Sequence, residues 1–233
     1  MNTAELLVQC LENEGVEYVF GLPGEENLHI LEALKNSSIK FITTRHEQGA
    51  AFMADVYGRL TGKAGVCLST LGPGATNLMT GVADANLDGA PLVAITGQVG
   101  TDRMHIESHQ YLDLVAMFSP VTKWNTQIVR PNNTAEIIRK GFKIAQAEKP
   151  GAVHIDLPEN IAAMEVTVEA PLNRDSREMT YASFRSFNVA AEAISKAKHP
   201  LILVGNGAIR AEASEALTEF ATILHIPVVN TFM

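Results

Sequence analysis

The sequence predicts an α/β protein in which a doubly wound parallel sheet is covered by helices on both faces. Short apolar runs alternate with helix-like segments across residues 1–165. The runs are apolar at nearly every position, as in strands that are buried on both faces. A chain of 233 residues with 46% hydrophobic residues can also bury a sizeable core. These three observations favour the alternating order of an α/β fold.

The first predicted helix begins after Asn2, where Glu5 three residues later completes a capping-box pattern. Gly15 ends this helix, and its apolar stripe is formed by Leu6, Leu7, Cys10 and Leu11. Further helices are expected at residues 28–34, 48–60, 75–87 and 134–147, between strands at residues 16–20, 41–44, 65–70, 91–96 and 152–157. A helix between successive strands is the usual connection of parallel strands.

The chain is predicted to divide into two units. Residues 1–165 form the first domain, and residues 166–188 are polar without steady periodicity, which is typical of a linker. Residues 189–233 begin a second α/β unit, whose turn Gly205-Asn206-Gly207 is by itself weak support for dinucleotide binding. About 45 residues are too few for a stable α/β domain. We therefore expect the chain to be a truncated fragment of a longer protein.

Composition excludes several classes of function. The net charge is −8 and no run of five basic residues occurs, which argues against a nucleic-acid surface. Cys10 and Cys67 lie in apolar surroundings without metal-type spacing, and we expect both to be reduced core thiols. The sequence shows neither a signal-like start nor an apolar stretch of about 18 residues. We expect a cytoplasmic protein that does not enter the membrane.

Glu47 is the first candidate functional residue. It lies in Arg45-His46-Glu47-Gln48-Gly49-Ala50, directly after an apolar run, where a strand of an open sheet would present its carboxyl end to a ligand. One interpretation is a surface carboxylate favoured by the helix dipole. The alternative is a buried acid suited to proton transfer, because Gly49, Ala50, Ala51 and Ala54 are small enough for tight helix packing.

Three further turns follow predicted strands. The turn Gly72-Pro73-Gly74 lacks Lys and Arg and does not match a phosphate-binding loop, so it suits a flat neutral ring or is a generic turn. The turn Gly21-Leu22-Pro23-Gly24 and the polar loop Ser108-His109-Gln110 should lie at the same edge of the sheet. No group of carboxylates and histidines has the spacing of a metal site.

Together these motifs resemble, in order and spacing, the thiamine-diphosphate enzymes of the acetolactate synthase and pyruvate decarboxylase type. The acetolactate synthase branch is the most similar. The likeness covers residues 1–165 as the pyrimidine-binding domain, and residues 189–233 resemble the start of the family's Rossmann-like central domain. The matching motifs are Gly21-Leu22-Pro23-Gly24, Arg45-His46-Glu47-Gln48-Gly49-Ala50, Thr61-Gly62-Lys63, Gly72-Pro73-Gly74-Ala75-Thr76-Asn77, Ala94-Ile95-Thr96-Gly97-Gln98 and Pro150-Gly151-Ala152-Val153-His154-Ile155-Asp156-Leu157-Pro158.

The resemblance implies roles for individual residues. Glu47 would hydrogen-bond the pyrimidine ring nitrogen of thiamine diphosphate, and Gln110 would act with it as a catalytic residue in the reacting cavity. The implied cofactor-binding set is Pro23, Gly24, Glu47, Thr70, Pro73 and Asn77. The implied substrate pocket contains Gly21, Leu22, His109 and Gln110. No residue of this chain is expected to bind a metal.

The implied activity is the decarboxylation of pyruvate and the addition of the remaining two-carbon unit to a second 2-keto acid. In this family Mg²⁺ and the diphosphate are bound by a carboxy-terminal domain with a Gly-Asp-Gly motif, which this sequence lacks. The fragment alone is therefore expected to be inactive. Flavin-bearing members usually have phenylalanine at His109 and arginine at Lys149, so we expect no FAD.

The resemblance also implies a homodimer or homotetramer. Whether the role is catabolic or lies in branched-chain amino acid biosynthesis is left open. Two alternatives are kept: another thiamine-diphosphate enzyme, such as pyruvate oxidase or a 2-keto acid decarboxylase, and a non-catalytic dimerisation module. Small residues on the helix from Ala75 to Ala85 would allow the close helix packing that such a module needs.

Overall fold

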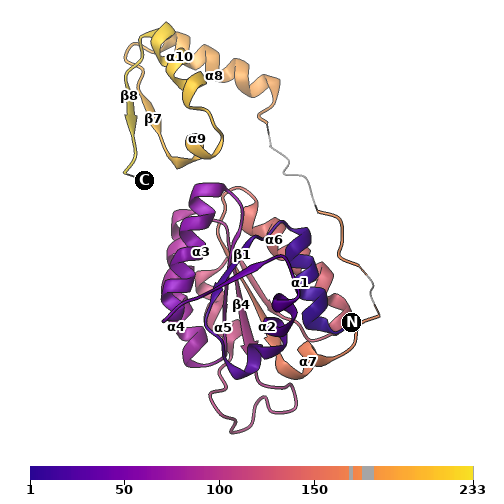
Figure 1. Ribbon diagram of the computed structural model, residues 1–233. Helices are drawn as coiled ribbons and strands as arrows, with labels where there is room; N and C mark the ends of the chain where they lie inside the picture. The colour runs from indigo at the N-terminus through magenta and orange to yellow at the C-terminus, as the bar shows by residue number, and fades with distance from the viewer. Residues whose placement is uncertain (168–169, 175–180, 233) are drawn as a thin grey trace. The chain divides into compact units, whose positions relative to one another are not determined.

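A six-stranded parallel sheet forms the centre of the first unit of the chain (Figure 1). The computed structural model describes residues 1–167, 170–174 and 181–232, which belong to two units, residues 1–175 and 176–233. The strand order is β2-β1-β3-β4-β6-β5, and all pairs are parallel. The strands are β1 Tyr18–Gly21, β2 Lys40–Thr43, β3 Gly65–Ser69, β4 Leu92–Gln98, β5 Trp124–Gln127 and β6 Ala152–Pro158. The predicted α/β class is confirmed.

Helices cover both faces of this sheet (Figure 1). One face carries α1 Thr3–Asn13, α2 Leu28–Lys35, α6 Thr134–Gln146 and α7 Glu159–Ala163. The other face carries α3 Glu47–Thr61, α4 Pro73–Asp88 and α5 Leu114–Phe118. Short 3₁₀ turns lie at Glu25–Asn27, Ser119–Val121 and Pro131–Asn133. Because both faces are covered, β3, β4 and β6 are buried along their whole length.

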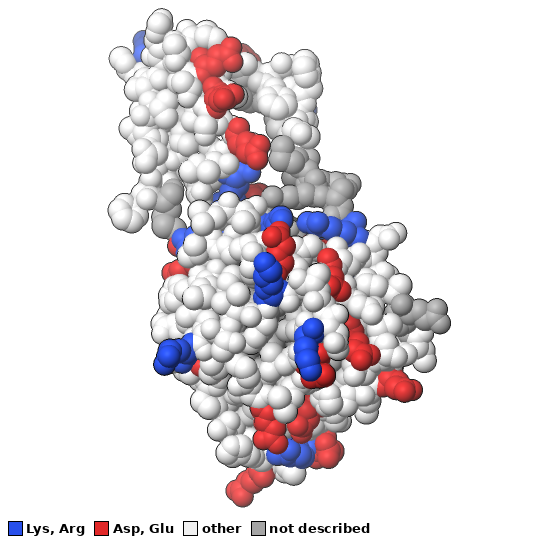
Figure 2. Space-filling view, in the orientation of Figure 1, with Lys and Arg blue, Asp and Glu red and all other residues white. Residues whose placement is uncertain are grey.

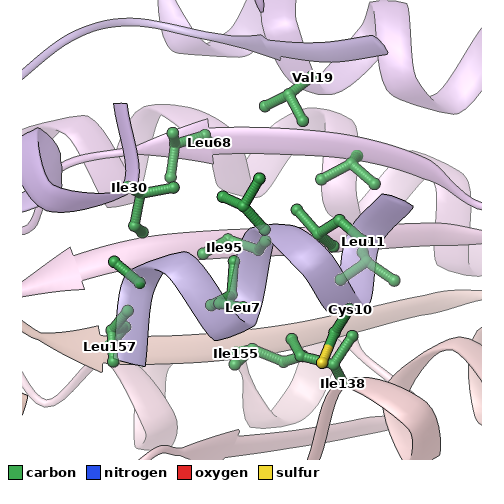
Figure 3. Close-up of a cluster of buried hydrophobic side chains, with 14 of the residues drawn as sticks. Leu7, Cys10, Leu11, Val19, Ile30, Leu68, Ile95, Ile138, Ile155 and Leu157 are labelled. Atoms are coloured by element: carbon green, nitrogen blue, oxygen red, sulfur yellow. The ribbon is translucent and has the colours of Figure 1, made fainter. Parts of the chain in front are cut away.

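The core on the α1 face is built from the apolar stripe that the sequence predicts (Figure 3). Leu7 and Leu11 point from α1 toward the sheet and toward Ile138 of α6, and all three are at most 1% exposed. The helix begins as expected, because Asn2 Oδ1 accepts from the Glu5 amide at 2.9 Å. The Glu5 carboxylate accepts from the Asn2 amide at the same distance of 2.9 Å. Both halves of the predicted capping box are therefore present.

The opposite face depends on backbone approaches that only glycine allows. A Cβ at Gly65 of β3 would lie 2.0 Å from the Ala54 carbonyl oxygen of α3. A Cβ at Gly81 of α4 would lie 2.6 Å from the Ala51 Cβ. Gly81 of α4 therefore packs inside this unit, against α3, and Ala75 and Ala85 of the same helix are also buried. Ala83 remains half-buried.

The structure corrects several predicted elements of the first unit. Strand β5 and helix α5 were not predicted, because Trp124-Asn125-Thr126-Gln127 is not an apolar run and α5 has only five residues. As an edge strand, β5 pairs with β6 alone and remains half-buried. Part of the expected linker is attached to the first unit, because Asn13 donates to the Leu172 carbonyl at 2.8 Å. Residues 168–169 and 175–180 of that expected linker lie outside the described residues.

The second unit contains two parallel strands and three helices among its described residues. They are α8 Phe184–Lys196, β7 Ile202–Val204, α9 Asn206–Arg210, α10 Ser214–Leu224 and β8 Val228–Asn230. Helix α8 begins five residues before the expected start at residue 189. Ile226 is the one hydrophobic residue buried in the described part, whereas Phe184, Leu203 and Ile223 are 80%, 68% and 66% exposed. This unit therefore lacks a core of its own.

We expect a separate chain of residues 176–233 to unfold without a cooperative transition. Its secondary structure is not supported by buried apolar side chains, which supply most of the stability of small domains. Residues 1–175 are the control and should unfold cooperatively in urea when followed by circular dichroism. A sharp transition of residues 176–233 alone would contradict this expectation.

Candidate functional site

The strand order reverses beside β1, and this reversal creates the candidate site. From β1 the chain moves outward to β2 and then returns to β3 on the other side of β1. Open α/β sheets bind ligands outside the carboxyl ends of the strands at such a switch point. The turn Gly21–Gly24 leaves β1 here, and the turn Thr70–Gly74 leaves β3.

The two turns are in direct contact. A Cβ at Gly24 would lie 2.5 Å from the Thr70 Cβ, so the absence of a side chain lets the turns meet. The buried Asn27 side chain shapes the first turn, because its Oδ1 accepts from the Gly24 amide at 3.0 Å and its Nδ2 donates to the Leu22 carbonyl at 3.2 Å. Thr70 Oγ1 donates to the Glu26 carboxylate. Pro23 is exposed beside this contact.

Glu47 is the first residue of α3 and is only 7% exposed. Its Oε2 accepts a hydrogen bond from Asn77 Nδ2 of α4 at 2.9 Å. Its Oε1 faces Gly74, where a Cβ would lie 3.3 Å away. The dipole of α3 favours a negative charge at this position. His46 caps the same helix through Nδ1, which accepts from the Gln48 amide at 3.2 Å.

Gly72 brings the polar loop after β4 to this edge of the sheet. Its φ of +54° is rarely adopted by residues with a side chain, and a Cβ there would lie 2.6 Å from the Gln110 carbonyl oxygen. Gln110 itself has a φ of +56°. Pro73, at the start of α4, and His109 are exposed. The contact with Gly72 therefore places the backbone of Gln110 beside the N-terminus of α4.

The structure gathers the predicted site residues at one edge of the sheet. Gly21 and Leu22 lie against β3, where the Leu22 amide donates to the Leu68 carbonyl at 3.2 Å. Lys149 lies elsewhere, because its Nζ donates to the Leu87 carbonyl at the C-terminal end of α4, whereas the site is at the N-terminal end. Gly62, with a φ of 67°, ends α3 and is likewise remote from Glu47.

Sequence reasoning missed a buried polar network between β4, β5 and β6. Thr96 Oγ1 donates to Asp156 Oδ1 at 2.6 Å and lies 2.9 Å from His154 Nε2. Gln127 Nε2 donates to Asp156 Oδ2 at 2.7 Å. Burial raises the pKa of Asp156 to about 6, although its hydrogen bonds oppose the shift, and burial lowers the pKa of His154 to about 3. The sequence did contain a sign of this network, because the ionisable residues His154 and Asp156 lie inside an otherwise apolar strand.

Within residues 1–167, 170–174 and 181–232, no three His, Cys, Asp or Glu side chains are grouped as metal ligands would be. None of the helices there is long and apolar enough to span a bilayer. On the face shown in Figure 2, basic side chains lie among acidic ones and do not form one basic area.

Comparison with known proteins identifies the class of this chain. Residues 1–117 match the family described as thiamine pyrophosphate enzyme, N-terminal TPP binding domain. Residues 187–233 match the thiamine pyrophosphate enzyme, central domain. The chain therefore belongs to the thiamine pyrophosphate enzymes, and the family resemblance predicted from the motifs is confirmed.

The similar curated proteins are named acetolactate synthases. The chain is 42% identical to the probable acetolactate synthase large subunits of Methanococcus aeolicus and Methanocaldococcus jannaschii, over 100% of its own length and 40% of theirs. It is 39% identical to the acetolactate synthase large subunit of Corynebacterium glutamicum, over 100% of its length and 38% of that protein. The chain thus spans about two-fifths of the length of these relatives.

We expect Gly72→Ala to lower the free energy of unfolding of the first unit by roughly 1–3 kcal/mol, because alanine is strained at this backbone conformation and would strike Gln110. Gly49→Ala is the matched control. A Cβ there meets nothing within 4 Å, so the helix should be unchanged or more stable by about 0.5–1 kcal/mol. Urea unfolding followed by the fluorescence of Trp124, the one tryptophan, measures both variants. Equal effects of the two substitutions would refute the assigned role of Gly72.

The raised pKa of Asp156 predicts a pH dependence of stability. Its folded-state pKa of about 6 exceeds the ordinary value of 3.8, so its stabilising contribution is full at acid pH and is lost as the pH rises through about 6. Between pH 3.8 and about pH 6, the free energy of unfolding of the wild type should fall by about 1.4 kcal/mol per pH unit relative to that of Asp156→Asn. Urea unfolding of both proteins across this pH range measures the difference. A difference that does not change with pH would show that Asp156 titrates normally.

Proposed function

We propose that this chain is the amino-terminal part of an acetolactate synthase catalytic subunit. The whole protein would use thiamine diphosphate to decarboxylate pyruvate and join the product to a second 2-keto acid, giving a 2-aceto-2-hydroxy acid. The observation that carries this proposal is the buried Glu47 carboxylate, hydrogen-bonded to Asn77 at the switch point of the sheet. The names of the relatives support the choice of reaction.

The residues at this edge fit the neutral end of the cofactor. A Cβ at Gly74 would lie 2.9 Å from Thr70 Cγ2 and 3.3 Å from Glu47 Oε1, so glycine lets the backbone of this turn approach the carboxylate without a side chain between them. The segments 21–24 and 70–77 contain no Lys or Arg, as expected for a ring without charge. We propose that Pro23, Gly24, Thr70, Pro73 and Asn77 surround the pyrimidine ring. The thiazolium ring of the bound cofactor supplies the carbanion and the electron sink of the reaction.

Glu47 would then control one proton in the reaction. Asn77 donates to Oε2, which leaves Oε1 to hydrogen-bond the pyrimidine ring nitrogen. Exchange of a proton between this oxygen and the ring nitrogen is general acid–base catalysis by a positioned carboxyl group. Gln110, held beside Gly72, would orient the reacting substrate, and Gly21, Leu22 and His109 would line its pocket.

Other parts of the whole protein would complete the active site. We propose that Mg²⁺ and the diphosphate are bound by a further domain, so that the 233-residue chain alone does not form acetolactate. The absence of FAD is also part of this proposal, and it rests on His109 and Lys149, which stand where flavin-bearing members usually have phenylalanine and arginine. A homodimeric or homotetrameric cytoplasmic enzyme fits the same family assignment.

The proposal predicts the effect of Glu47→Gln in the full-length parent protein. Glutamine keeps the shape of the side chain but cannot exchange the proton, so deuterium exchange at C2 of bound thiamine diphosphate should slow by about 10²–10⁴-fold. The matched control is Glu17→Gln, which removes a carboxylate that pairs with Lys63 on the surface and should leave the exchange rate unchanged. Proton NMR of the cofactor after acid quenching measures the rate. Wild-type exchange in Glu47→Gln would overturn the assigned role.

A further inference from the structure

The loop between β4 and α5 carries His109 and Gln110, and its outgoing end is attached to α7. The Gly100 amide donates to Glu159 Oε1 at 3.2 Å, and the Thr101 amide donates to Asn160 Oδ1 at 3.0 Å. The outgoing end is thus fixed by the first two residues of the helix that follows β6. The returning end, near Leu112, needs a separate attachment.

The Gln98 carboxamide joins the two ends of this loop. Its Oε1 accepts from the Val99 amide at 3.1 Å on the outgoing side. Its Nε2 donates to the Leu112 carbonyl at 3.0 Å on the returning side. Gln98 is only 1% exposed, so water does not compete for these contacts. The orientation of this amide group therefore helps to hold the backbone two residues after Gln110, in addition to the contact of Gln110 with Gly72.

The Asp156 carboxylate sets that orientation. Gln98 Nε2 also lies 3.5 Å from Asp156 Oδ2, at the outer limit of a hydrogen bond, and the carboxylate is completely buried. An ionised carboxylate only accepts hydrogen bonds, so it favours the NH₂ group of Gln98 on its own side. The Gln98 oxygen then faces Val99, and the NH₂ group can reach both Asp156 and the Leu112 carbonyl.

We propose that Asp156 is a positioning residue for the candidate site: acting through Gln98, it holds the returning end of the loop 100–113 and thereby places Gln110. The importance of Gln110 for the reaction rests on the proposed function. The position of the loop does not, because every contact that carries it lies within this chain. A residue that only fills the core would influence global stability without a selective effect on this loop.

Hydrogen exchange of the 233-residue chain tests this role, with mass spectrometry of peptides that cover residues 100–113. Asp156→Asn and Gln98→Ala should each speed amide exchange in the loop by about tenfold. This is the factor expected when one hydrogen bond to a charged group is lost, or when the charged group that orients the Gln98 amide is lost. Peptides from β3 should be less affected. The double variant should exchange no faster than Gln98→Ala alone, because the two residues act in series.

Gln127→Ala is the matched control. It removes a donor to the same Asp156 oxygen, and the Gln127 side chain donates to that oxygen and not to the loop, so the substitution should leave loop exchange unchanged. If Gln127→Ala speeds loop exchange as much as Asp156→Asn does, Asp156 has only a structural role. Wild-type loop exchange in Asp156→Asn, or additive effects in the double variant, would also overturn the proposal.

A pH profile tests the same role in the wild-type chain, even if a variant fails to fold. Protonation weakens Asp156 as an acceptor, so loop exchange, corrected for its intrinsic rate, should increase between about pH 8 and about pH 5. The other titratable groups around Asp156 are His154, Tyr111 and Asp113. The lowered pKa of His154 and the raised pKa of Tyr111 keep both neutral in this range.

Asp113→Asn tests whether the remaining acid, Asp113, causes the pH response. The substitution removes its charge, and asparagine can still cap α5 through its side-chain oxygen. The pH response should persist in this variant, and its loss there would overturn the assignment to Asp156. The measurements use no cofactor, so they are independent of the reaction. If the loop responds as expected while Glu47→Gln leaves cofactor exchange unchanged, the proposed function fails and the positioning role stands.

Discussion

The close approach of α3 to β3 and to α4 is the constraint on which the candidate site depends. Gly65 and Gly81 permit backbone contacts that any Cβ would block. Because α3 and α4 are held this closely, their first turns lie side by side, and Glu47 and Asn77 meet at 2.9 Å. The pair therefore depends on the absence of side chains at Gly65 and Gly81, where the backbone meets Ala54 and Ala51 of α3.

Features that depend on neighbouring residues in the sequence were predicted better than features that depend on contacts in the folded protein. Apolar runs marked the central strands, and the turns after β1 and β3 were recognised from their glycines and prolines. Asn27 was missed because its two hydrogen bonds to the Leu22–Gly24 turn cannot be inferred from spacing alone. Strand β5 was missed because its inward residues are amides, which pair with partners that only the folded sheet supplies, such as Gln127 with Asp156. Lys149 contacts the C-terminal end of α4, away from the candidate site, and the sequence motif gave no sign of this position.

The chemistry of the edge supports the proposal that other parts of the whole protein complete the binding site. Two helix N-termini, those of α3 and α4, point their amide groups toward the same edge, but the first turn of α4 carries Pro73 and no basic side chain. One carboxylate already occupies this region. A phosphate placed there would meet the negative charge of Glu47, whereas a neutral ring with donor and acceptor atoms would not. The charged end of a cofactor must therefore be held by other groups.

The carboxylates of Glu47 and Asp156 are both buried, but they differ in how completely their oxygens are satisfied. Asp156 receives hydrogen bonds from Thr96, Gln98 and Gln127 and is fully enclosed, so it has no free oxygen for a ligand. Glu47 receives one hydrogen bond, from Asn77, and its second oxygen faces a glycine. A saturated acid can act only by orienting its neighbours. An acid with one oxygen beside a glycine can exchange a proton with a group that reaches that oxygen. This difference supports the proposed roles of Glu47 as the reacting group and of Asp156 as the positioning group.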